Sequence, residues 1–262
     1  MISKIFHLKL KLICCLSFAV VILVSCGGSS PDPLEKLKRQ LDPYPEYSVI
    51  LVDMREDGFL FTNYYHLYRI IYLDRELKEG EPILREKVTP WYPVSKALYE
   101  KYRPCLGMTI LAKEKDGTIN DTPQPPAYQF VGDTRFGQWK TDEKGNQIWE
   151  WIGKYYVIST IMDILGRGHT IRYDDWRDYR TSVGRKKPYF GPRDETGSPT
   201  FGTGGKWTEK KYPTFFERQQ ARMSAKKAGF EQRVSQSMGK TKVSTFTTRT
   251  TSGSFGGRIG GK

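Results

Sequence analysis

The stretch Tyr47-Ser-Val-Ile-Leu-Val-Asp-Met54 is rich in aromatic and β-branched residues, which predicts a largely buried strand. Arg55-Glu56-Asp57-Gly58 follows as its turn. The next predicted extended segment runs from Phe59 to Tyr72. Near its end, Tyr68, Ile70 and Tyr72 make one side wholly apolar or aromatic, and Leu67, Arg69 and Ile71 make the other side mixed. This pattern predicts the partner strand, or pair of strands, of a hairpin that starts the sheet.

Two further hairpins are predicted downstream. In the first, Met108 to Lys113 alternates, Asp116-Gly117 tolerates the positive φ of a tight turn, and Thr118-Ile119 resumes the strand. In the second, Phe136–Lys140 and Gln147–Ile152 flank a polar turn. The three hairpins predict an antiparallel sheet.

Short helices are expected between these hairpins. Leu34 to Leu41 suits two helical turns with Asp32 as a cap, and Ser95 to Tyr102 suits a short helix. Lys154 to Leu165 is apolar almost all round, which favours a buried helix, although its β-branched content leaves a strand as the alternative. The fold class expected for residues 34–184 is therefore α+β, with one hydrophobic core.

Charge divides the chain beyond residue 25 in two. Residues 26–184 hold 22 Lys and Arg against 24 Asp and Glu, whereas residues 185–262 hold 17 against 5. The second part is also rich in Gly, Ser, Thr and Pro, which bury too little apolar area to offset the entropy of ordering. We therefore expect residues 185–262 to be a largely disordered basic tail.

One amphipathic helix is expected inside this tail, at about 214–238. Thr214 and Glu217 have the spacing of a capping box. A narrow apolar stripe on this helix is a candidate partner surface, and its members are Phe216, Met223, Phe230, Val234 and Met238. Lys227 interrupts the stripe and Gly229 weakens the helix, so the pattern is impure.

The first residues predict an export signal. Lys4, Lys9 and Lys11 precede an apolar run from Leu12 to Val24, which is shorter than the ~20 residues that a membrane-spanning helix needs. The run closes on Leu23-Val24-Ser25-Cys26-Gly27 and resembles the lipobox of bacterial lipoproteins. The resemblance implies that residues 1–25 are a signal peptide. It also implies that Cys26 receives a diacylglycerol on its thiol and, as the new first residue, an acyl chain such as palmitate.

The resemblance covers the leader alone and implies a place in the cell envelope. Residues 26–33 would be the lipidated cysteine and a spacer, and two or three acyl chains would hold the protein stably on a bilayer. In a Gram-negative host, Gly27 after the cysteine favours the outer membrane. An uncleaved anchor and an ordinary signal peptide remain as alternatives.

Motifs that carry enzyme chemistry are absent from the sequence. His66 and His169 lack the spacing of HExxH, no G-x-S-x-G is present, and Gly202-Thr-Gly-Gly-Lys206 lacks the spacing of a phosphate loop. Asp174, Asp175 and Asp178 lie among arginines, which favours local ion pairs over a cation site. Cys105 suits a small buried hydrophobe. We expect no metal, no cofactor and no enzymatic activity.

Three tryptophans offer a possible ligand platform. Trp149 and Trp151 share a face of one predicted strand, and Trp139 lies on its hairpin partner. Such a cluster could stack on sugar rings, but core packing under the following helix is favoured, because sheets commonly bury aromatic residues.

Two functional hypotheses follow. The first is a non-enzymatic, membrane-tethered envelope lipoprotein with an interaction or scaffolding role, whose basic tail contacts an anionic lipid, an anionic envelope polymer or an envelope protein. Export from the cytoplasm argues against nucleic acid as the partner of the tail. The second is a module that binds a glycan or another small ligand through Trp139, Trp149 and Trp151.

Overall fold

The computed structural model describes residues 32–58, 61–78, 81–152, 155–166 and 168–240. The predicted signal peptide and Cys26 therefore lie outside the described residues, as does the end of the predicted tail from residue 241. The chain divides into two compact units, with the boundary between Phe216 and Glu217. The first unit is α+β, as the hairpin pattern predicts.

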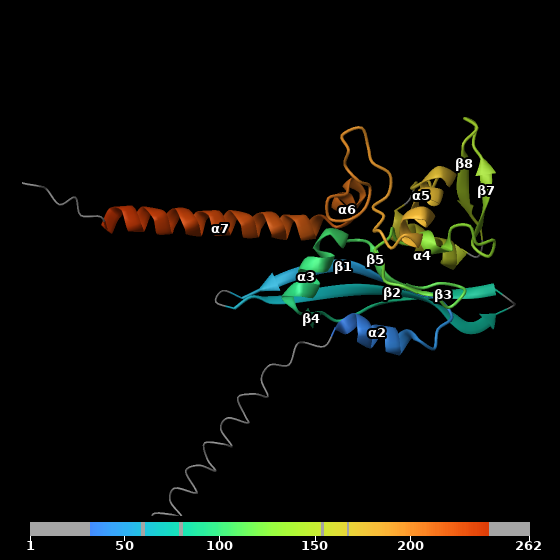
Figure 1. The fold of residues 1–262 in the computed structure, drawn as a ribbon, viewed down its shortest axis with the longest axis horizontal. Coiled ribbons are helices and arrows are strands. Elements are labelled where there is room, and N and C mark those ends of the chain that lie inside the picture. Colours follow the sequence, from blue (N-terminus) through green and yellow to red (C-terminus); the bar gives the residue numbers. More distant parts are fainter. Residues whose placement is uncertain (1–31, 59–60, 79–80, 153–154, 167, 241–262) are drawn as a thin grey trace, which may run out of the picture. The chain divides into compact units, whose positions relative to one another are not determined.

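A six-stranded antiparallel sheet forms the centre of the first unit (Figure 1). Its strand order is β3-β2-β1-β5-β6, and β4 also pairs with β2. The strands are β1 (Tyr47–Asp57), β2 (Asn63–Lys78), β3 (Glu81–Val88), β4 (Tyr92–Val94), β5 (Thr109–Lys113) and β6 (Ile119–Asn120). The strand predicted at Tyr47 is thus paired along both edges, and its hairpin with β2 is confirmed. The predicted turn at Arg55–Gly58 is wrong, because β1 continues to Asp57 and pairs with β2 there.

Both faces of β1 are covered. Its first five residues, Tyr47 to Leu51, are all buried, so neighbouring side chains that point to opposite faces are equally protected from water. Tyr47 lies opposite Tyr72, and Val49 lies opposite Ile70. Continuous burial along a strand requires packing layers on both sides of the sheet.

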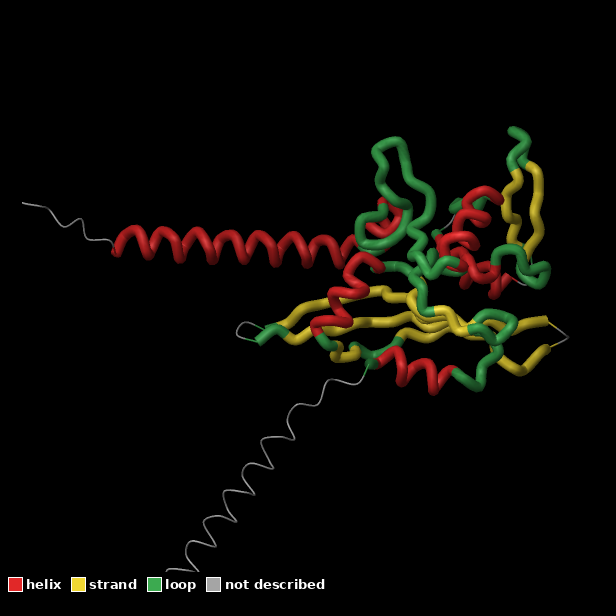
Figure 2. The backbone as a smooth tube through the Cα atoms, viewed as in Figure 1, coloured by secondary structure: helices red, strands yellow, loops and turns green. Residues whose placement is uncertain are grey.

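Helices supply these layers, with α2 below the sheet and both α4 and α5 above it in the view of Figures 1 and 2. The helices of the first unit are α2 (Pro33–Leu41), α3 (Lys96–Tyr102), α4 (Tyr155–Leu165), α5 (Tyr173–Gly184) and α6 (Lys206–Lys211). The side chain of Asp32 accepts a hydrogen bond of 2.9 Å from the backbone N–H of Leu34, which confirms the predicted cap. Residues 155–165 form a helix, so the strand alternative is wrong.

The predicted third hairpin forms a separate two-stranded sheet, β7 (Gly137–Thr141) and β8 (Gln147–Trp151). The predicted second hairpin is β5 and β6, which joins the main sheet. Alternation identified both hairpins, but it contained no information on which of them would extend the sheet that starts at β1.

Residues 185–216 belong to the first unit, so the prediction of a disordered tail beginning at residue 185 is wrong. Phe201 is 0% exposed and Phe215 is 4% exposed, and both lie in the hydrophobic core. Tyr189, Phe190, Trp207, Tyr212 and Phe216 pack against that core. A few large aromatic residues bury enough area to order a segment whose average composition is polar.

Glycine permits the close approach of this segment. Gly202 has φ +81°, and a Cβ built on it would lie 2.6 Å from the carbonyl oxygen of Pro104. Composition alone counts these glycines as flexible residues, whereas Gly202 and Gly205 both allow close packing of the backbone. The backbone of Gly205 also touches that of Thr200, where a Cβ would lie 2.4 Å from the carbonyl oxygen.

The helix predicted at about 214–238 is present as α7 (Pro213–Lys240). It begins at Pro213, a residue suited to the first helical position. The second unit starts within this helix, at Glu217. None of the side chains described from residue 217 to residue 237 is buried.

Replacing Phe201 by Ala should lower the free energy of unfolding by about 3–5 kcal/mol, because it leaves a cavity in the core. Phe230→Ala is the matched control, since Phe230 is 62% exposed and its replacement should change stability by no more than about 0.5 kcal/mol. Urea unfolding of the full chain measures both values. Equal, small effects would show that residues 185–216 contribute little to the core.

Candidate functional site

The three predicted tryptophans lie together on the β7–β8 hairpin. Trp139 is the direct cross-strand partner of Trp149, with ring centroids 5.1 Å apart. Trp149 lies 6.0 Å from Trp151. Their planes meet at 67° and 88°, and Trp149 is only 5% exposed. This edge-to-face packing forms a cluster, not the flat platform that stacking on a sugar would need.

Helix α5 adds two aromatic residues that sequence reasoning missed. Tyr173 lies 5.0 Å and Trp176 lies 5.6 Å from Trp139, measured between ring centroids. The two residues are three apart on a helix, which places them on one side of it. That spacing was visible in the sequence, but nothing there indicated which strand they would meet.

Trp176 connects the aromatic cluster to an open groove of about 570 Å³. The indole N–H of Trp176 donates a 3.0 Å hydrogen bond to the carbonyl of Val131. Gly132, with φ +88°, passes so close that a Cβ there would lie 2.9 Å from the Trp176 ring. The ring is therefore held in one orientation by the loop that it contacts. The groove is lined in part by Lys115, Gln129, Gly132, Asp133, Trp176 and Arg180.

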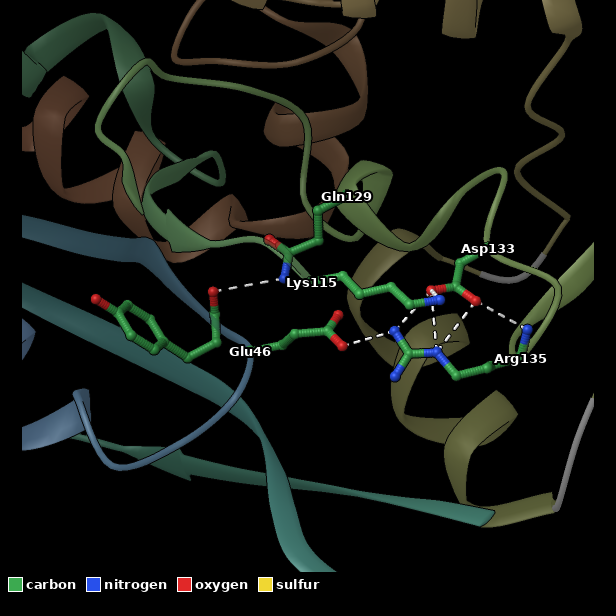
Figure 3. A network of polar contacts seen from close by, with 6 residues as sticks. Glu46, Lys115, Gln129, Asp133 and Arg135 are labelled. Carbon is green, nitrogen blue, oxygen red and sulfur yellow. Dashed lines mark hydrogen bonds and ion pairs between the residues drawn. The ribbon is translucent and has the colours of Figure 1, made fainter. Parts of the chain in front are cut away.

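A charged network stands beside this groove (Figure 3). The guanidinium of Arg135 donates hydrogen bonds of 2.6 Å from Nη2 both to Glu46 Oε1 and to Asp133 Oδ2. The Nζ atom of Lys115 lies 3.4 Å from Asp133 Oδ2. Glu46 immediately precedes β1 and is 4% exposed, so the network ties the loop beside the groove to the central strand.

The two carboxylates of the network respond differently to their surroundings. Burial raises the pKa of Glu46 above its usual value, an effect that the hydrogen bond from Arg135 only partly offsets. Burial also acts to raise the pKa of Asp133, but the hydrogen bonds from Arg135 outweigh it and the pKa is lowered. Asp133 therefore stays charged beside the groove, balanced by Arg135 and Lys115.

Gln129 fixes the same loop through its amide. Its Nε2 donates to the carbonyl of Tyr47 at 3.4 Å, and its Oε1 accepts from the hydroxyl of Ser48. Both partners are on β1. Figure 3 shows Gln129 near Lys115 and the charged network. The wall of the groove is thus tied to the buried first half of β1.

Arg135→Ala should destabilise the protein by about 2 kcal/mol, because Glu46 would remain buried without its cation. Lys140→Ala is the control, since its pair with Glu150 is solvent-exposed and its loss should change stability little. Thermal and urea unfolding measure both. If Glu46→Gln does not recover part of the loss in the Arg135→Ala background, the explanation through Glu46 is wrong.

A second polar cluster anchors α5. Asp175 accepts hydrogen bonds of 2.5 Å from the hydroxyls of Tyr128 and Tyr189, and His169 Nε2 lies 3.5 Å from the Tyr128 hydroxyl.

Asp174 does form the predicted local ion pair, at 3.2 Å from Arg177. For Asp175 the principal partners are instead two tyrosines that are distant in sequence.

His66 is a buried strand residue, as predicted. Its Nδ1 lies 3.0 Å from the Tyr68 hydroxyl, and its Nε2 is buried with no hydrogen-bond partner among the described residues. Burial lowers the pKa of His66 to about 4. The ring is therefore neutral at pH 7.

This histidine should make the fold sensitive to acid. Below its unfolded pKa of about 6.5, the unfolded chain gains a proton that the folded ring refuses until about pH 4, so stability is lost across this window as the pH falls. From pH 7 to pH 5 the expected loss is about 2 kcal/mol. Urea unfolding of wild type and His66→Gln at both pH values isolates this contribution. An equal loss in the two proteins would contradict the assignment.

The predicted partner helix is divided between the two units. Phe216 packs against the core of the first unit, whereas Met223, Phe230 and Val234 are 65%, 62% and 37% exposed on α7. We call these three residues the apolar row. At 3.6 residues per turn, four basic side chains lie within an arc of roughly 80° around the helix axis, next to the apolar row. We call them the basic row: Arg218, Arg222, Lys226 and Arg233.

Cys105 is 2% exposed, and burial raises the pKa of its thiol to about 12, as suits a packing residue. Within the described ranges, no group of three His, Cys, Asp or Glu side chains could hold a metal ion. Among the helices that the structure describes, none is long and apolar enough to cross a bilayer.

Comparison with known proteins adds no relative: no protein-family model, curated protein or solved structure matches this chain. The functional interpretation therefore depends on the two surfaces described above, the groove beside Trp176 and the two rows of α7.

Proposed function

We propose that this protein is a lipid-anchored, non-enzymatic envelope protein whose C-terminal unit contacts an anionic surface. The observation that carries the proposal is α7, whose basic and apolar rows lie side by side, and none of whose described side chains from residue 217 to residue 237 is buried. From Glu217 to Lys262 the chain has ten Lys and Arg against two Glu. The tether is proposed from the lipobox at Cys26, in a bacterial envelope.

The electrostatic part of this function has a simple physical basis. Clustered cations attract anionic polymers and anionic lipids, and salt screens the attraction over a Debye length of about 8 Å at physiological ionic strength. A lipid anchor keeps the C-terminal unit close to the envelope, so a weak contact becomes effectively intramolecular. The role would be interaction or scaffolding.

The test compares lipid-free chains of residues 27–262 and 27–216, mixed with cell-wall sacculi or anionic vesicles across a salt series. The shorter chain ends at the unit boundary and keeps Phe201 and Phe215. Only the longer chain should bind, and salt should release it. Salt-resistant binding, or equal binding by both chains, would contradict an electrostatic role for the C-terminal unit.

A second candidate is a module that binds a neutral glycan or a similar polar ligand. The observation in its favour is the groove, which combines the fixed ring of Trp176 with carboxylates already balanced by cations. Aromatic walls with oriented polar groups are typical of small-ligand sites. Binding of sacculi by residues 27–216 alone would favour this candidate over the first.

A further inference from the structure

The two rows of α7 differ in what they need from a partner. The apolar row exposes Met223 and Phe230 by 65% and 62%, so it gains from leaving water. The basic row gains from anionic groups. A hydrophilic polyanion would satisfy the basic row and leave the apolar row in water, whereas the surface of an anionic bilayer offers headgroups and hydrocarbon within one helix diameter.

The arrangement of charges around the helix also suits a bilayer surface. The basic row lies on one flank of the apolar row, and Glu217 and Glu231 lie on the other. A helix with this asymmetry is expected to roll toward its basic flank, which brings the cations to the phosphates and turns the glutamates toward water. Lys227 lies next to the apolar row, and its long stem can reach the headgroups from there.

We propose that α7 lies flat on an anionic phospholipid bilayer, with the apolar row at the edge of the hydrocarbon and the basic row among the phosphates. This inference rests on the proposed function, because it names the surface that the C-terminal unit contacts. The apolar row is short, so binding depends on both rows together, and the nearby lipid anchor strengthens it.

Two labelled variants of the full lipidated chain test the position of the helix. One variant carries a nitroxide at Phe230→Cys and the other at Gln232→Cys, two positions on nearly opposite sides of α7. Cys105 is too buried to compete for the label. In phosphatidylglycerol vesicles, the label at position 230 should be more accessible to oxygen and less accessible to a water-soluble nickel chelate than the label at position 232. In phosphatidylcholine vesicles, both should face water.

Charge removal tests the basic row. On anionic vesicles, the lipid-free chain should lose roughly fivefold in partition coefficient for each cation removed, so Arg222→Gln with Lys226→Gln should weaken binding roughly 25-fold. The control is Lys144→Gln with Lys186→Gln, two exposed lysines of the first unit, whose loss should leave binding nearly unchanged. Equal weakening by both pairs would overturn the proposal.

The labels separate failure of this inference from failure of the anchor. If the lipidated protein floats with both kinds of vesicle but the two labels stay equally exposed to water, the anchor stands and the bilayer contact of α7 is refuted. If the protein does not float with neutral vesicles, the Cys26 anchor is refuted. In that case, anionic vesicles are added to the same protein, and the accessibility of its two labels to oxygen and to the nickel chelate tests the helix contact without the anchor.

Discussion

The burial of both faces of β1 is the constraint on which the first unit depends. Tyr47, Val49 and Leu51 are 0% exposed on one side of the strand, and Ser48 and Ile50 are 0% and 1% exposed on the other. Each large apolar side chain contributes about 1.5–3 kcal/mol when fully buried. Ordering the backbone costs about 1–2 kcal/mol per residue, so a strand that buried only one of its two faces would contribute little net stability.

This demand explains why distant segments join the core. Helices cover the sheet on both sides, and residues 185–216 add the rings of Phe201 and Phe215 to the same cluster. Polar groups then fasten the irregular parts. Glu46 and Ser48, at the start of β1, hold the loop of Gln129 and Arg135, while Asp175 ties α5 to Tyr128 and Tyr189. These hydrogen bonds and ion pairs hold the loop and α5 in place, so the groove has a fixed aromatic wall formed by Trp176.

The second unit follows a different rule. From Glu217 to residue 237 the described side chains of the helix are not buried, and its apolar and basic residues lie in separate rows around the axis instead of forming a core. A helix of this kind is only marginally stable alone in water, and a surface that accepts both rows would stabilise it. The same helix thus begins as part of a core at Phe215 and continues as a candidate contact surface.

Local pattern was sufficient for much of the fold. The β-branched and aromatic residues of Tyr47–Met54, the alternation up to Tyr72 and the turn residues near Gly117 identified the hairpins. The cap at Asp32 and the apolar stripe from Phe216 identified α2 and α7. These signals depend only on neighbours in the chain. The edge-to-face contact of Trp139 with Trp176, the two tyrosines on Asp175 and the ordering of residues 185–216 were decided by tertiary structure. Each of these depends on residues far apart in sequence, and averaged composition conceals the few aromatic side chains that supply the burial energy.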